Sequence, residues 1–318
     1  MTNPRGDEYK HVGWGDDAPA CYLCGKRMHY KFEKEGYPIF QCVECVFECI
    51  HPQADDAALA AIYTRSYFDI YGKDSDEALT AFRKMKQRSF ESFMGMIGPV
   101  ETGSRLVDCG AGTGFLVDYA RGIGLDAFAI EFSDYGAEEC RKIAGPGHVF
   151  QGEVEQSRFD ANPDDRYEIV TMIDFIEHVR NPRSVLQWAA AHLTPNGNLL
   201  IVTPGLGGVS HLLFGRHWPN YYPEHLWYFG RKSLSRLLVE CGFRVRAVKA
   251  AVKYLSPQYI INRHRAYQYH ALIGVPCSLA DKLLPGGLKN LNIPLRTGDI
   301  LVHATMSTPR SDQHAGNP

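Results

Sequence analysis

Four cysteines near the start of the sequence form two pairs with the same internal spacing. Cys21 and Cys24 make the first pair, and Cys42 and Cys45 make the second. Each C-x2-C pair can direct two thiolates at one ion, and four thiolates complete a tetrahedral shell that leaves no position for water. The spacing is typical of a zinc ribbon and predicts a structural Zn²⁺ site within residues 21–52.

The other cysteines give no sign of a disulfide framework. The chain has nine cysteines and no apolar export signal at its start, so we expect thiols or metal ligands. Redox activity of the two pairs is a weaker alternative, because redox pairs usually open a helix of a thioredoxin-like unit. Cys49 and His51 could replace a ligand, but four cysteines at suitable spacing make this unnecessary.

A glycine-rich turn is the second group with chemical potential. The stretch DCGAGTG at 108–114 joins an apolar segment to a helical one and contains Gly110, Gly112 and Gly114. Glycines let backbone N–H groups approach an anion, and the N-terminus of the next helix adds favourable potential. Dinucleotide loops read G-x-G-x-x-G, whereas position 115 here is Phe. NAD is therefore the less favoured ligand.

Acidic residues follow in an order that suits a nucleoside. Glu131 closes the next apolar segment, where a carboxylate can accept from both hydroxyls of a ribose. Asp108 precedes the glycines and can accept from an ammonium group. Glu131 suits a dinucleotide as well as another nucleoside cofactor, so it does not by itself decide between them.

Histidines supply candidate bases. His225 lies in the aromatic segment 214–234, and His178 lies in the EHV stretch after another apolar segment. Imidazole is the usual general base near neutral pH. In the alternative interpretations, His225 only ties its segment to the core by hydrogen bonds, and His178 or Glu177 only caps the helix that starts near Pro182.

A later insertion contains several basic residues. They would suit a phosphate or carboxylate, but most Arg and Lys are exposed, so we expect a solvated helix face. The residues are Arg263, His264, Arg265 and His270.

Alternating strands and helices must position these groups. Helical stretches 10–12 residues long separate most of the apolar segments, as the crossovers of a parallel sheet require. The pattern predicts an α/β fold with a Rossmann-like, doubly wound sheet of seven strands. The expected strands are 105–109, 126–131, 147–150, 167–173, 198–203, 243–250 and 299–305, and the expected crossover helices are 114–123, 133–143, 182–193 and 231–241.

The same pattern divides the chain into regions. We expect a flexible N-terminus, a zinc ribbon, a helical linker, a main α/β domain with an inserted lid and cap, and a disordered tail. Their ranges are, in that order, 1–20, 21–52, 53–98, 99–306 (lid 206–230, cap 253–297) and 307–318.

The amino-acid composition limits the classes of molecule that the protein is expected to bind. The formal net charge of −2 gives no basic footprint for nucleic acid, and the apolar runs are broken by Pro, Gly and polar residues. We expect a cytoplasmic protein that acts on a small molecule and binds neither nucleic acid nor a membrane.

The glycine spacing, Glu131, the GEVE stretch and the IDFIEHVRNP stretch together resemble the class I methyltransferases that use S-adenosylmethionine (SAM). With the ribbon included, the chain is similar to zinc-ribbon sugar C-methyltransferases, although too few residues follow 251 for their further C-terminal domain. The resemblance implies SAM and structural Zn²⁺ as cofactors. It also implies SAM contacts from Asp108, Gly110, Gly112, Gly114, Glu131, Glu153 and Asp174.

The resemblance further implies roles in catalysis. His225 would be the general base, Glu224 its partner and Tyr222 a hydrogen-bonding orienter of the acceptor, with His178 as a second candidate base. The acceptor would be a small polar metabolite, such as a sugar nucleotide or a natural-product intermediate, with an anionic group as one option. Carbon, oxygen and nitrogen all stay open as the methylated atom. The alternatives are an RNA-modifying enzyme docked through the ribbon and a noncatalytic SAM-fold scaffold.

Overall fold

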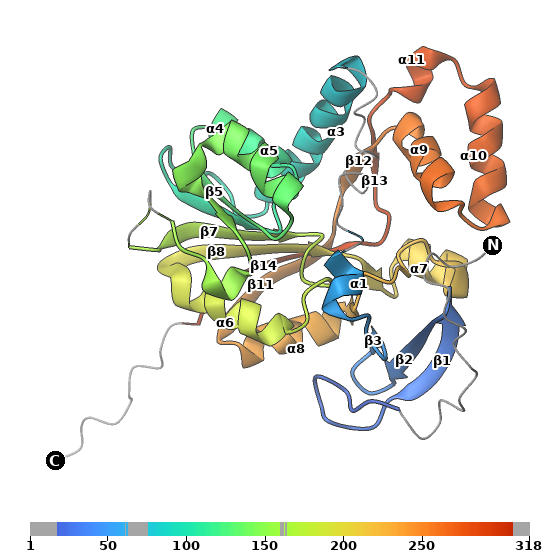
Figure 1. Cartoon of the computed structure of the whole chain (residues 1–318), viewed down its shortest axis with the longest axis horizontal. Coiled ribbons are helices and arrows are strands. Elements are labelled where there is room, and N and C mark those ends of the chain that lie inside the picture. Colours follow the sequence, from blue (N-terminus) through green and yellow to red (C-terminus); the bar gives the residue numbers. More distant parts are fainter. Residues whose placement is uncertain (1–17, 61, 63–75, 160–161, 163, 308–318) are drawn as a thin grey trace.

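A twisted sheet of seven strands forms the centre of the computed structural model, which describes residues 18–60, 62, 76–159, 162 and 164–307. The strand order is β6-β5-β4-β7-β8-β14-β11, and β14 is antiparallel to both of its neighbours (Figure 1). The strands are β4 (Arg105–Cys109), β5 (Asp126–Glu131), β6 (Val149–Gln151), β7 (Tyr167–Ile173), β8 (Leu193–Thr203), β11 (Phe243–Ala250) and β14 (Ile300–Met306). The predicted fold class is confirmed.

Helices cover both faces of this sheet. One face carries α3 (Asp76–Met94), α4 (Phe115–Gly122) and α5 (Asp134–Ala144), and the other carries α6 (Pro182–His192) and α8 (Arg231–Glu240) (Figure 1). The central strands are buried on both faces, which explains their continuous apolar runs. Side-chain caps begin two of the crossovers: Ser133 accepts from the Gly136 N–H, and Asn181 accepts from the Ser184 N–H.

The ribbon region shares its sheet with the lid. Strands β1 (His29–Lys34), β2 (Tyr37–Cys42) and β3 (Phe47–Ile50) are extended by β10 (Trp227–Gly230) and β9 (Gly205–Leu206). In this sheet β10 pairs antiparallel with β3. This shared five-stranded sheet was not predicted, because β10 joins a partner far away in the sequence.

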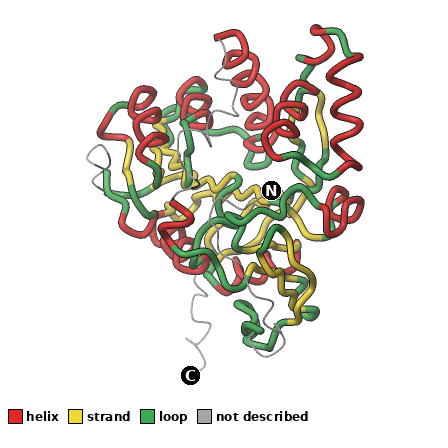
Figure 2. Tube along the Cα trace, turned by 45° about the vertical axis from the view of Figure 1, so that its right-hand side comes forward, coloured by secondary structure: helices red, strands yellow, loops and turns green. Residues whose placement is uncertain are grey.

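The predicted cap region folds mainly as helices. It contains β12 (Lys253–Leu255), α9 (Pro257–Tyr267), α10 (Ala271–Leu283), α11 (Gly286–Lys289) and β13 (Ile293–Leu295), and the lid adds α7 (Val209–Phe214). The cap helices stand beside α3 in both views (Figures 1 and 2), and the rings of Phe82 and Tyr259 lie 5.6 Å apart at this contact. Three short 3-10 helices complete the described elements: Pro146–His148, Val154–Gln156 and Gly215–His217.

The linker and the ends are described in part. The linker contains α1 (Asp56–Ala60) and α3, while 61 and 63–75 lie outside the described residues. The predicted flexible N-terminus and disordered tail fall almost entirely on 1–17 and 308–318, which also lie outside them. Within the described part of the chain, no helix has the length and apolar character needed to span a bilayer.

Candidate functional site

A single cavity of about 840 Å³ lies at the carboxyl ends of β4 to β8. This edge is where open α/β sheets bind their ligands. The glycine turn lines one part, and the lid and cap line another. All but one of the predicted SAM-binding and catalytic residues line it: Asp108, Gly110, Gly112, Glu131, Glu153, Asp174, His178, Tyr222, Glu224 and His225. The exception, Gly114, lies at the end of the same turn.

Gly110 and Gly114 are required both by their positive φ angles and by the lack of space for a Cβ atom. Gly110 has φ +75°, and a Cβ there would lie 2.2 Å from Cδ2 of Phe175. Gly114 has φ +79°, and a Cβ there would lie 2.9 Å from Cδ1 of Ile143 on α5. The glycine spacing therefore keeps the turn clear of Phe175 and packs α4 closely on α5.

Two buried carboxylates lie beside this turn. Glu131 holds it directly, since its Oε2 accepts from the Gly112 N–H at 2.8 Å while its Oε1 accepts from the Ser133 N–H at 2.8 Å. Burial raises the pKa of Glu131 in spite of these bonds. Asp108 accepts from the Thr171 hydroxyl at 2.7 Å, and burial raises its pKa to about 7. The third predicted acid, Glu153, is exposed at the rim of the cavity, before the 3-10 helix Val154–Gln156.

An ion-pair network in the cavity contains Lys253, a cation that was not predicted from the sequence. Lys253 Nζ lies 2.8 Å from Asp174 Oδ1 and 3.2 Å from Asp299 Oδ1. Burial opposes ionisation of Asp174, but the attraction of Lys253 outweighs it and lowers the pKa of Asp174. Burial likewise opposes the charge of Lys253, and the two carboxylates raise its pKa above the ordinary value. In the sequence Lys253 is a single lysine shortly after the strand Phe243–Ala250, and no motif singles it out.

Glu177, His178 and His225 form a compact cluster in the cavity wall. One potential ligand atom from each lies within 4.8 Å of the others. Glu177 is 1% exposed; its Oε2 accepts from the Thr203 hydroxyl at 2.9 Å, and its Oε1 has no hydrogen-bond partner among the described residues. Burial raises the pKa of Glu177 to about 8 and lowers the pKa of His178 to about 4.

Both imidazoles lie against the backbone of the lid. His225 Nδ1 lies 2.8 Å from the Asn220 carbonyl, and the backbone of Glu224 lies near His178, where it partly offsets the lowering of the His178 pKa by burial. Burial lowers the pKa of His225 well below its ordinary value. The capping alternative for His178 and Glu177 is wrong, because Asn181 caps α6.

The predicted side-chain pairing of Glu224 with His225 is not found among the described residues. The Glu224 side chain is buried and lines the cavity, and burial raises its pKa. Asn220 takes the place of Glu224 as the hydrogen-bond partner of His225, because the turn before β10 brings the Asn220 carbonyl to Nδ1. His225 is therefore oriented by a backbone carbonyl and not by the side chain of the preceding residue.

One arginine of the cap belongs to the cavity. Arg263 Nη2 donates to the Tyr222 hydroxyl at 3.0 Å, its Nε donates to the Tyr269 hydroxyl at 3.1 Å, and the guanidinium lies 4.6 Å from the Tyr267 ring centroid. The expected solvated helix face is therefore wrong for Arg263, because that side of α9 packs toward the lid. It holds for Arg265, which is exposed and pairs with Asp281.

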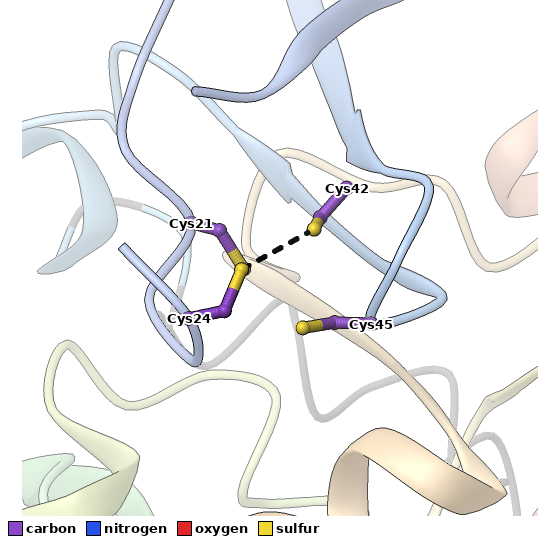
Figure 3. A group of neighbouring side chains, drawn as sticks. All are labelled: Cys21, Cys24, Cys42 and Cys45. Carbon is purple, nitrogen blue, oxygen red and sulfur yellow. Dashed lines mark hydrogen bonds between the residues drawn. The ribbon is translucent and has the colours of Figure 1, made fainter. Parts of the chain in front are cut away.

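The four ribbon cysteines converge as predicted. Their sulfur atoms lie within 4.8 Å of one another, and Cys24 Sγ is 3.7 Å from Cys42 Sγ (Figure 3). Four soft sulfur donors at this separation fit a tetrahedral zinc site. The cluster does not contain the other two candidates, since Cys49 instead contacts the Met28 sulfur at 3.6 Å and His51 packs against Phe40.

Comparisons with known proteins point to one family. A family model described as "Methyltransferase domain" matches residues 78–248, which is more than half of the chain. The mitochondrial ubiquinone biosynthesis O-methyltransferase of Schizosaccharomyces pombe is 27% identical over 128 residues, which are 39% of this chain and 45% of that protein. The matched part thus spans less than half the length of this curated relative.

Solved structures agree in fold. A complex between the Haloferax volcanii Trm112 methyltransferase activator and a methyltransferase matches with a TM-score of 0.51 and 13% identity, covering 80% of this chain and 99% of that chain. The [4+2]-cyclase SpnF also matches with a TM-score of 0.51, at 14% identity, covering 80% of this chain and 98% of that chain. At such identities the likeness is one of fold alone.

Proposed function

The chain belongs to the family of SAM-dependent methyltransferases, and from this premise we propose that it methylates a small polar metabolite that carries an anionic group. The observation behind this proposal is one cavity that runs from the glycine turn to Arg263. SAM supplies a methyl group that its sulfonium already activates, so the protein must position the acceptor, remove its proton and exclude water.

We assign the SAM end of the cavity to the residues around the glycine turn. The turn at 110–114 would receive the methionyl carboxylate, Asp108 its ammonium group, Glu131 the ribose and Glu153 the adenine amino group. The fit rests on bare backbone at the start of α4 and on buried carboxylates at the ends of β4 and β5. Asp174 also borders this space, but Lys253 already occupies one of its oxygens.

We assign the other end to the acceptor. Among the described residues, no carboxylate lies within ion-pair distance of Arg263, whose hydrogen bonds go to two tyrosine hydroxyls. A guanidinium partly removed from water, with no carboxylate of the described residues within 4.0 Å, favours an anionic ligand, and its planar fork suits carboxylate or phosphate. Tyr222 shares this hydrogen-bond network and would orient the acceptor.

His225 is the proposed base for the reaction. A carbonyl only accepts, so Nδ1 donates to Asn220 and the other nitrogen of the neutral ring is left to receive a proton. His178 stands beside it, with 4.6 Å between the ring centroids, as the second candidate. Replacement of His225 by Ala is expected to lower turnover far more than SAM affinity; equal losses in both would assign it a structural role.

The ribbon would hold a structural Zn²⁺ and support the lid. Cys45 lies 3.6 Å from Nη1 of Arg236 on α8, and β3 pairs with β10 directly after His225. We infer that the ion fixes β3, the strand with which the lid strand β10 pairs. It has no proposed part in methyl transfer, because four cysteines leave no open position.

A screen with labelled SAM tests the proposed function. Small hydroxylated compounds bearing a carboxylate or phosphate are compared with neutral analogues of the same size. The proposal predicts methylation of anionic members, a KM at least tenfold higher in Arg263→Ala, and little change in Arg265→Ala, the matched control on the solvent side of α9. Equal turnover of neutral and anionic members by all three proteins would refute the anionic acceptor.

A further inference from the structure

We propose that Glu177, His178 and His225 bind one divalent transition-metal ion in the wall of the cavity. The three residues offer a carboxylate oxygen and two imidazole nitrogens, with ligand atoms within 4.8 Å of one another. All three line the cavity that contains the glycine turn. A metal held there would stand between the proposed SAM end and the proposed acceptor end.

A buried oxygen without a partner is the first observation behind the proposal. Glu177 Oε1 is buried and accepts no hydrogen bond from the described residues, whereas Oε2 is held by Thr203. An unsatisfied carboxylate oxygen costs free energy when it is buried, so a native structure usually supplies a partner for it. Among the described residues only Oε2 accepts a hydrogen bond, so Oε1 can bind a ligand.

The second observation is the way in which the two imidazoles contact the lid backbone. His225 is tied at Nδ1 to the Asn220 carbonyl of the lid, and His178 lies against the lid backbone at Glu224. Metal-binding histidines almost always donate their second ring N–H to a carbonyl or carboxylate, which fixes the ring orientation. His225 therefore has the supporting hydrogen bond that is typical of a metal ligand.

Backbone contacts hold the two segments that carry the donors in register. The carbonyl of Glu177 accepts from the N–H groups of Leu226 at 2.9 Å and Trp227 at 3.3 Å. The loop after β7 is thereby attached to the lid at the residues that follow His225. These backbone hydrogen bonds hold Glu177 and His178 at a defined distance from His225.

The donor types decide the kind of ion. Two imidazoles with one carboxylate suit Zn²⁺, Fe²⁺, Co²⁺ or Mn²⁺, whereas Ca²⁺ and Mg²⁺ prefer all-oxygen ligand sets. Three protein ligands leave coordination positions open, unlike the four thiolates of the ribbon. Those positions would face the cavity, where an acceptor hydroxyl could enter.

The chemistry of this ion rests on the proposed methyltransferase function. An ion at this point lowers the pKa of a coordinated hydroxyl. The acceptor O–H proton then passes to solvent, the oxygen forms a bond to the methyl carbon, and the S–C bond breaks with its electron pair left on sulfur. The products are a methyl ether, S-adenosylhomocysteine and one proton. With the ion bound, His225 is a ligand and the ion activates the acceptor. In the metal-free protein His225 keeps the role of base.

Metal content after dialysis tests the proposal on the full-length protein. The proteins are the wild type, Glu177→Gln, His225→Gln, Cys21→Ser and, as a matched control, His303→Gln, which removes a half-buried histidine outside the cavity. Each is loaded with Co²⁺ alone, the bound metal is counted by elemental analysis, and the visible spectrum separates thiolate ligands from nitrogen and oxygen ligands. SAM affinity is measured on the same samples by calorimetry.

We expect about two equivalents in the wild type and His303→Gln, given one four-cysteine site and one three-ligand site. Glu177→Gln and His225→Gln should fall to about one equivalent that keeps the thiolate bands, and Cys21→Ser should lose those bands and keep the other metal. Equal metal content and spectra in the wild type and in both cluster variants would overturn the proposal. A wild type that binds the second metal but not SAM would instead refute the proposed function and leave the metal site standing.

Discussion

SAM affinity should depend steeply on pH between 5.5 and 7 because of Asp108. Burial raises the pKa of this carboxyl to about 7 in the free protein. Only the ionised form attracts an ammonium group, so the apparent Kd equals the intrinsic Kd divided by the ionised fraction. That fraction is about one half at pH 7 and about one thirtieth at pH 5.5, so affinity should fall roughly fifteenfold on acidification.

The direction follows from proton binding. The free protein holds a proton on Asp108 below its raised pKa, and the bound protein releases it, so binding weakens as pH falls. Calorimetry in two buffers of different ionisation enthalpy measures this release directly. We expect about half a proton per SAM at pH 7 and about one at pH 5.5.

Two Asp→Asn variants provide the comparison. Asp108→Asn keeps the shape of the side chain and its contact with Thr171, and it should bind SAM more weakly with a nearly flat pH profile. Asp118→Asn removes a partly exposed carboxylate of α4 that pairs with Arg83, and it should follow the wild type. Any slope left in Asp108→Asn would belong to Glu131, whose pKa is also raised by burial. A full wild-type slope in Asp108→Asn, or no slope in the wild type, would show that Asp108 does not set the pH dependence of SAM binding.

Three further predictions test the turn, the ribbon and the ion-pair network. Gly110→Ala should lower the melting temperature and weaken SAM binding, because an alanine at φ +75° and in contact with Phe175 costs about 1–3 kcal/mol of stability. The control Gly122→Ala places its Cβ in open space, so the same thermal melt should show a neutral or slightly stabilising effect. Cys21→Ser or chelation should speed hydrogen exchange in β10 and lower turnover while SAM affinity holds, since β3 pairs with β10; unchanged exchange in β10 would separate the ribbon from the lid. Lys253→Met should destabilise the fold by about 1–3 kcal/mol in denaturant titration, because the buried Asp299 and the partly exposed Asp174 lose their cation. A loss no larger than that of the exposed control Lys249→Met would show the network to be unimportant.

Most of the sheet could be predicted from the sequence because its signals are local. Apolar runs mark the central strands, and helices 8–11 residues long separate most of them as crossovers. The glycine turn and Glu131 were found for the same reason, since each stands at the end of a predicted strand. β8 shows the limit of such signals: it begins at Leu193, before the Pro and Gly that suggested a loop, because Leu193 pairs with Tyr167.

The missed features depend on packing between distant segments. β10 is only four residues long, and its pairing with β3 follows from where the ribbon lies in space. Arg263 and Arg265 look alike in sequence, yet two positions apart on a helix they face different surroundings. Lys253 and Glu177 gain their importance from carboxylates, a hydroxyl and imidazoles that only the folded chain brings near them.

A crystal structure with S-adenosylhomocysteine would show directly whether one cavity joins the cofactor site to the acceptor site. We predict the amino-acid end of the ligand at the 110–114 turn, its ribose at Glu131 and its sulfur directed toward His178 and His225. A ligand bound outside this cavity, or bound in it with its sulfur directed away from the two imidazoles, would show that the cavity does not join the two sites in this way.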